Sequence, residues 1–317
     1  MCKEVMFLKF ETKEILFDSA NGLYKVHGKI LKPVNKEIKG IIQISHGMCE
    51  YIDKYDDFAE YMLKQGFVVA GHDHIGHGNS VNKSEDKGFF ASKDGYKYMI
   101  QDLKTATDAI KEEIPDKPVY MLGHSMGSLI ARCYVAKYGN EINGLILCGT
   151  VGPQPLAKAG IKMVNYIAAK KGERYRSRKI YELSLDFANV RFLPVKTRYD
   201  WVSSDEAEVK RHMQDERANF VFTVKGFSDL FHLVNLANSE MVIKTIPKSL
   251  PIIFMSGDKD PIGENGTGVM KAVKLYRNMG ITNVRIKLYP NKRHELLKEK
   301  NKKEVFEDIS KWIKVHI

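Results

Sequence analysis

Five residues near the middle of the chain, Gly123-His124-Ser125-Met126-Gly127, could carry nucleophilic chemistry. An apolar, strand-like run from Val119 to Leu122 precedes them, and a helix-like pattern from Ser128 to Tyr138 follows. A serine on a sharp strand-to-helix turn projects its hydroxyl out of a sheet, and the flanking glycines let the backbone pass. The pattern therefore predicts Ser125 as the nucleophile of an acyl-transfer enzyme.

An alcohol is a weak nucleophile at neutral pH, so Ser125 needs a base, and the base needs an orienting acid. After a turn of this kind the acid and then the histidine follow in the chain. His294 stands in a loop after the strand-like run that ends at Tyr289, where sites of open α/β sheets lie. The acid should also follow a strand, and Asp258 and Asp260 both do, so spacing alone leaves the two open.

Two backbone N–H groups are expected to stabilise the oxyanion that forms when Ser125 attacks a carbonyl. One is the N–H of Met126, at the start of the following helix. The other is the N–H of Met48, because Ser45-His46-Gly47-Met48 directly follows the apolar run Gly40 to Ile44.

His72, His74 and His77 follow the spacing of the zinc-binding histidines of binuclear metallohydrolases. That pattern has an aspartate just before the third histidine, where this chain has Gly76. No further His and Asp cluster with ligand spacing accompanies it. We therefore expect a structural loop beneath the site, with no bound metal.

Strand-like runs alternate with helix-like patterns along most of the chain, which predicts βαβ units and a mainly parallel sheet flanked by helices. A hairpin around Asn21-Gly22 is expected near the start. Residues 1–150 and 250–317 are predicted to form this α/β core. Its later strand-like runs are Phe67 to Ala70, Val119 to Leu122, Leu145 to Cys148, Ile252 to Met255 and Val284 to Tyr289.

Residues 151–249 interrupt the alternation and are too long for a connecting loop, so we predict an inserted helical cap. Its expected apolar helix face consists of Leu156, Met163, Val164 and Ile167, of which Met163 and Ile167 are candidate substrate contacts. Two places are open to each of the cap histidines, His212 and His232: the wall of a substrate pocket or, as we expect, a buried or surface position with a structural role. A basic cluster is either a solvated face or a surface that docks transiently on anionic lipid; its members are Lys170, Lys171, Arg174, Arg176, Arg178 and Lys179.

Composition excludes several classes of protein. The chain has 317 residues, of which 44% are hydrophobic and 28% charged, so it is neither collagen-like, a coiled coil nor disordered. Its 50 basic and 39 acidic residues give a net charge of +11. No strand–turn–helix pattern ends in a concentrated Lys and Arg face that could bind nucleic acid, so we expect no nucleic-acid partner. The four cysteines form no CxxC pair, and we find neither a signal peptide nor a membrane-spanning run, so we expect a cytoplasmic protein.

Taken together, these motifs resemble the monoacylglycerol lipase and lysophospholipase branch of the α/β-hydrolase fold, which is often grouped with serine aminopeptidases. The resemblance covers almost the whole chain and implies that fold. The motifs that carry it are His46 to Glu50, His72 to Ser80, Gly123 to Gly127, Gly257 to Asp260, and His294.

The resemblance also implies an activity: a serine ester hydrolase that cleaves a monoacylglycerol or a lysophospholipid through an acyl-enzyme and needs no cofactor. In that family the last residue of the Gly-x-x-Asp motif is the acid, which makes Asp260 the partner of His294. Three alternatives remain: a small-ester carboxylesterase, a non-catalytic binding protein, and a proline-type aminopeptidase. The aminopeptidase would hold a substrate ammonium with cap carboxylates, for which the candidates are Asp205, Glu206, Glu208, Asp215 and Glu216.

Overall fold

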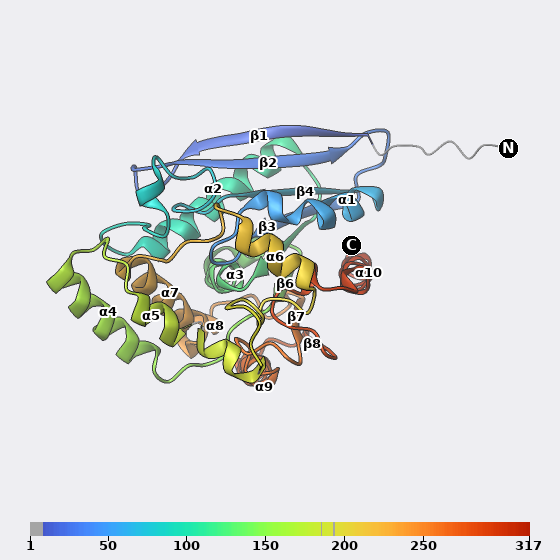
Figure 1. Ribbon diagram of the computed structural model, residues 1–317. Coiled ribbons are helices and arrows are strands. Elements are labelled where there is room, and N and C mark those ends of the chain that lie inside the picture. Colours follow the sequence, from blue (N-terminus) through green and yellow to red (C-terminus); the bar gives the residue numbers. More distant parts are fainter. Residues whose placement is uncertain (1–8, 185, 193) are drawn as a thin grey trace.

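The computed structural model describes residues 9–184, 186–192 and 194–317 and contains one eight-stranded sheet in the order β1-β2-β4-β3-β5-β6-β7-β8 (Figure 1). β1 and β2 pair antiparallel, β2 also pairs antiparallel with β4, and all later pairings are parallel. The predicted hairpin and mainly parallel sheet are therefore confirmed. The strands are β1 (Phe10–Asp18), β2 (Lys25–Pro33), β3 (Gly40–Ser45), β4 (Phe67–His72), β5 (Val119–His124), β6 (Gly144–Cys148), β7 (Ile252–Gly257) and β8 (Val284–Tyr289).

Helices cover both faces of the sheet, because alternate side chains of each central strand point to opposite faces. In β5, Leu122 packs in one apolar cluster with α1 (Asp56–Lys64) and α10 (Lys302–Lys314). Met121 packs in another cluster with helices of the opposite face, namely α2 (Gly95–Glu113), α3 (Met126–Tyr138) and α9 (Thr267–Asn278). Both sides of the central strands are therefore buried, as their continuous apolar runs require.

Between β6 and β7 the chain forms mainly helices, which occupy the segment for which a cap is predicted. One of them, α7, packs against both α3 and α4 and so joins this segment to the rest of the fold. The helices are α4 (Ala157–Lys171), α5 (Arg178–Ser184), α6 (Glu206–Gln214), α7 (Val224–Ala237) and α8 (Glu240–Ile243). The 3-10 turns among the described residues are η1 (Ile52–Tyr55), η2 (Ser84–Asp86), η3 (Gly139–Glu141), η4 (Asp186–Phe192) and η5 (Leu296–Lys298).

The parallel strands bring distant loops together. The segments after β3, β4, β5, β7 and β8 all leave the sheet at its carboxyl edge, where open α/β sheets place their sites. No helix in the described part of the chain has the length and apolar character needed to cross a bilayer. Cys49, Cys133 and Cys148 are buried free thiols, and Cys2 lies outside the described residues.

Candidate active site

Ser125 stands at the sharp turn between β5 and α3. Its backbone has φ 49° and ψ −119°, a strained conformation for a residue with a side chain. A Cβ atom at Gly123 would lie 2.7 Å from the Cα of Ser128, and one at Gly127 would overlap the carbonyl oxygen of Ser45. Only glycine fits at these two positions, which is the steric reason for the Gly-x-Ser-x-Gly spacing.

His294 and Asp260 lie together after β8 and β7. The Nδ1 atom of His294 is 3.0 Å from both carboxylate oxygens of Asp260. Asp260 is fully buried, and its Oδ1 also accepts a hydrogen bond from the backbone N–H of Ile262. Asp258 instead accepts the backbone N–H of Asn291 at 2.7 Å, away from His294. The geometry thus pairs His294 with Asp260 and not with Asp258.

A cavity of about 840 Å³ joins these residues. Ser125, His294, Met48 and Met126 all line it. Met126 is the first residue of α3, so its N–H has no partner within the helix. The arrangement suits a nucleophile, a base and two oxyanion donors around one carbonyl group.

Apolar side chains form most of the remaining cavity wall. Met163, a candidate substrate contact, is among them. Ile167 does not line the cavity and instead packs, partly buried, against the hydrophobic core. The other apolar wall residues include Leu156, Leu183, Leu230, Phe231 and Val234.

The family model described as "Serine aminopeptidase, S33" matches residues 36–301, which is most of the chain. The chain belongs to this family. It is therefore a serine hydrolase with the α/β-hydrolase fold.

Several similar proteins are named as lipases or esterases. The "Monoglyceride lipase homolog" of monkeypox virus is 28% identical over 292 residues, covering 91% of this chain and 94% of the relative. The human "Monoglyceride lipase" is 25% identical over 278 residues, covering 87% and 82% of the two chains. A solved thermostable carboxyl esterase from Bacillus coagulans, in complex with glycerol, superimposes with a TM-score of 0.90 at 32% identity, covering 97% of this chain and 99% of that one.

Sequence reasoning missed a buried ion pair next to the proposed triad. The Oε2 atom of Glu50 lies 2.9 Å from Nδ1 of His124 and also accepts the N–H of Gly47 and the hydroxyl of Tyr55. Burial alone would lower the pKa of His124, but the charge and hydrogen bond of Glu50 raise it. The His124 ring centroid is 5.0 Å from that of His294. Glu50 and His124 belong to the motifs His46 to Glu50 and Gly123 to Gly127. The sequence signal for the pair is an ionisable side chain, His124, at the end of the buried apolar strand β5.

A second polar group lines the same cavity. The Oε1 atom of Glu295 lies 3.9 Å from Nζ of Lys54 and 3.7 Å from Nδ1 of His212. His212 comes from α6, so a cap residue expected to be structural faces the cavity, while His232 stacks on Tyr96 outside it. Glu50 and Glu295, two carboxylates that line the cavity, therefore already face imidazole or ammonium groups.

The histidines after β3 and β4 form a buried cluster. His46, His72, His74 and His77 have no solvent exposure. His46 Nε2 accepts the N–H of His74, and His74 Nε2 contacts the hydroxyl of Ser45 at 2.9 Å. Burial lowers the pKa of all four histidines, to about 4 for His72 and His77. Within residues 9–184, 186–192 and 194–317, no group of three His, Cys, Asp or Glu side chains has an arrangement that could hold a metal ion.

The five candidate carboxylates of the cap lie elsewhere, since none of them lines the cavity. Asp205 caps α6, Glu206 pairs with Lys196, and Glu208 pairs with Arg211. Asp215 accepts the hydroxyl of Tyr51, and Glu216 lines a separate cavity. They are therefore not arranged to hold a substrate ammonium at Ser125.

Proposed function

We propose that the chain hydrolyses the carboxylic ester of a single-chain lipid, a monoacylglycerol or a lysophospholipid, through an acyl-enzyme. One observation carries the proposal: Ser125 and the His294–Asp260 pair open into one cavity whose wall is largely apolar. The names of the monkeypox virus and human relatives support the same substrate class.

In the proposed reaction, Ser125 attacks the ester carbonyl while His294 takes the hydroxyl proton. Asp260 holds the imidazole in the required tautomer and stabilises the imidazolium. The N–H groups of Met48 and Met126 bind the oxyanion. His294 then protonates the leaving alcohol, activates a water molecule, and so releases the fatty acid from Ser125.

A proline-type aminopeptidase is less well supported. Such an enzyme needs an uncompensated carboxylate near the scissile bond to bind the substrate ammonium. The acidic residues that line the cavity are Glu50, Glu264 and Glu295. Glu50 faces His124, Glu295 faces Lys54, and Glu264 pairs with Lys271, so each already has a partner.

The rim of the cavity supports transient contact with a membrane surface. Leu156 and Leu183 line the cavity and yet are 78% and 74% exposed. Lys170 and Lys171 end α4, and the Nζ atom of Lys170 lies 5.9 Å from the ring centre of the exposed Tyr166. Exposed apolar side chains at one end of α4 and cations at its other end suit a helix that lies along a membrane surface with anionic headgroups.

A substrate panel tests the proposal. Initial rates are compared for a monoacylglycerol, a lysophosphatidylcholine, p-nitrophenyl esters of increasing chain length, and prolyl-naphthylamide. We expect long-chain esters to have the highest kcat/KM and the amide to be inert. Faster cleavage of the prolyl amide than of any ester would contradict the proposal and favour the peptidase.

A further inference from the structure

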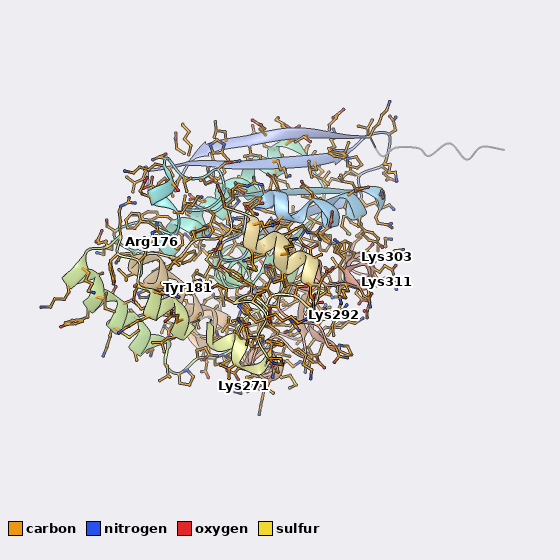
Figure 2. All side chains as sticks on the ribbon, viewed as in Figure 1. Arg176, Tyr181, Lys271, Lys292, Lys303 and Lys311 are labelled. Carbon is orange, nitrogen blue, oxygen red and sulfur yellow. The ribbon has the colours of Figure 1, made fainter. Side chains whose placement is uncertain are left out.

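One buried carboxylate lines the cavity that contains Ser125 and takes no part in the proposed reaction. Charged side chains usually stay in water, as those of Lys271 and Lys311 do at the edge of the fold in Figure 2, where they are 60% and 74% exposed. Glu50 is only 4% exposed. Burial alone would raise the pKa of its carboxyl group, but the charge and hydrogen bond of His124 hold that pKa well below its usual range. The fold therefore keeps an ionised carboxylate at the proposed active site.

A single oxygen atom of Glu50, Oε2, accepts hydrogen bonds from two separate parts of the chain. In the loop after β3, the N–H of Gly47 donates to it at 2.6 Å and the hydroxyl of Tyr55 at 2.7 Å. At the end of β5, the Nδ1 atom of His124 lies 2.9 Å from the same oxygen. His124 directly precedes Ser125. The carboxylate thus joins the loop after β3 to the turn that carries the proposed nucleophile.

The turn from Gly47 to Glu50 depends on this carboxylate for its shape. Within the described part of the chain, no backbone–backbone hydrogen bond holds these residues. Cys49 has a φ of 58°, a left-handed conformation that is strained for a residue with a side chain. The hydrogen bond from the N–H of Gly47 to Glu50 closes the turn. Met48, which is expected to supply one oxyanion donor, lies inside it.

The same turn packs directly against the turn after β5. A Cβ atom at Gly47 would lie 2.7 Å from Oε2 of Glu50, 2.9 Å from Nδ1 of His124 and 3.2 Å from the Cβ of Ser125. The backbone of Gly47 therefore fits between the carboxylate, the imidazole and the nucleophile. A shift of the Glu50 side chain would move this backbone relative to Ser125.

We propose that Glu50 is a positioning residue that presets the oxyanion hole. Its Oε2 atom fixes the turn that carries the N–H of Met48 against the turn that carries the N–H of Met126. Neither N–H donates to an acceptor among the described residues, which leaves both for an oxyanion. The proposal rests on the proposed function. Because the oxyanion exists only after Ser125 attacks, a misplaced donor should lower kcat and leave KM nearly unchanged.

The test separates the acceptor oxygen from its negative charge. All three hydrogen bonds go to Oε2, so Glu50→Gln keeps an acceptor there and places its amide nitrogen where Oε1 stands. Glu50→Leu removes the acceptor at similar volume. Tyr55→Phe, the matched control, removes one buried hydrogen bond to the same oxygen but changes neither oxyanion turn.

Steady-state kinetics on a p-nitrophenyl ester is measured for each variant, with urea unfolding to show that it is folded. We expect Glu50→Leu to lower kcat by about 10²-fold with KM within about two-fold of the wild type. Glu50→Gln and Tyr55→Phe should keep kcat within about three-fold, because the acceptor and both turns remain. If Glu50→Leu does not fold, the more flexible Glu50→Met takes its place.

A second measurement isolates the oxyanion by inhibition with a decyl trifluoromethyl ketone. The Ser125 oxygen adds to its carbonyl carbon, the carbonyl π electrons become the oxyanion, and the serine proton passes to His294. The corresponding alcohol fills the same cavity and forms no oxyanion. We expect Glu50→Leu to weaken inhibition by the ketone at least about ten-fold and to leave inhibition by the alcohol unchanged.

Several results would overturn the positioning role. One is equal kcat in Glu50→Leu and the wild type. Another is a loss in Glu50→Gln as large as in Glu50→Leu, which would show that the charge and not the acceptor is required. Equal weakening of ketone and alcohol would indicate a general loss of structure. If the wild type neither cleaves the ester nor binds the ketone, the proposed function fails. If it does both and the variants behave alike, only the role of Glu50 fails.

Discussion

Asp258 and Asp260 are two residues apart in the chain but have different surroundings. Asp260 is buried against His294, whereas Asp258 holds the backbone of Asn291. We expect Asp260→Asn to lower kcat by about 10⁴-fold, because an asparagine fixes the wrong imidazole tautomer. Asp258→Asn, the matched control, should lower it far less. Steady-state kinetics on one p-nitrophenyl ester checks both, and the reverse ranking would contradict the assignment.

At the scale of residues, a local motif such as the one around Ser125 can be predicted from the sequence. Contacts between residues that are far apart in the chain mostly cannot. The spacing around Ser125 is explained by two close backbone contacts at Gly123 and Gly127. The choice between Asp258 and Asp260 depends on how the loop after β7 turns towards His294, which spacing does not determine. The pairing of Glu50 with His124 likewise depends on where β3 and β5 end in the sheet.

At the scale of elements, the buried cluster of His46, His72, His74 and His77 at the ends of β3 and β4 makes the stability of the fold depend on pH. The unfolded chain binds a proton at His72 below about pH 6.5, whereas the folded chain does so only below about pH 4. Lowering the pH through this range therefore favours the unfolded state, by up to about 3 kcal/mol for this one residue. Above about pH 7 its effect is constant.

His72→Phe tests this dependence, because neither ring nitrogen of His72 has a hydrogen-bond partner among the described residues. We expect the free energy of unfolding in urea to fall less steeply in the variant, by about 1.4 kcal/mol per pH unit between pH 6 and 4.5. The comparison with the wild type is needed because Asp102 and Asp229, whose pKa values burial raises to about 6 and about 7, act in the opposite sense. Parallel pH profiles would show that His72 is protonated in the folded state.

Helix α4 contributes one wall of the cavity through Met163. Each methylene buried there should add up to about 0.8 kcal/mol of binding free energy, so kcat/KM should rise with acyl length and then level off. Met163→Gln should flatten this rise and leave acetyl-ester turnover unchanged. Met270→Gln, at an exposed methionine of α9 outside the cavity, is the control. A wild-type profile in which short esters equal long ones would contradict the acyl-chain site.

The order of the elements follows from the sequence because each buried strand is a continuous apolar run closed by a turn. β8 has the predicted bounds, and β5 and β7 extend only two residues beyond the predicted ends. The segment from 151 to 249 was less predictable, because its helices pack on α3 and on one another and their exposed faces are partly apolar. Ile167 illustrates the problem, since the helical pattern places it on one face with Met163, whereas in the structure it packs, partly buried, against the hydrophobic core.

At the scale of the whole molecule, the basic residues that give the net charge of +11 lie on different elements, among them α4 and α10. In Figure 1, α4 and α10 lie at opposite sides of the fold. If α4 docks on lipid, replacing Lys170 and Lys171 by glutamine should weaken binding to anionic vesicles and its salt dependence, because these forces are screened within about 10 Å at 0.1 M salt. The same change at Lys303 and Lys311 should have little effect. Vesicle co-sedimentation measures both, and equal losses would indicate attraction by net charge alone.

Ser125 as the nucleophile underlies every step of the proposed reaction, and covalent labelling tests this role directly. A fluorophosphonate probe forms a stable bond with an activated serine, and mass spectrometry of the digested protein locates it. We predict one label, on the peptide that contains Ser125, with neither label nor esterase activity in a folded Ser125→Ala variant. Ser310→Ala removes a buried hydroxyl that has no partner in the described structure and should label like the wild type. Labelling or ester hydrolysis that persists in Ser125→Ala would show that Ser125 is not the nucleophile.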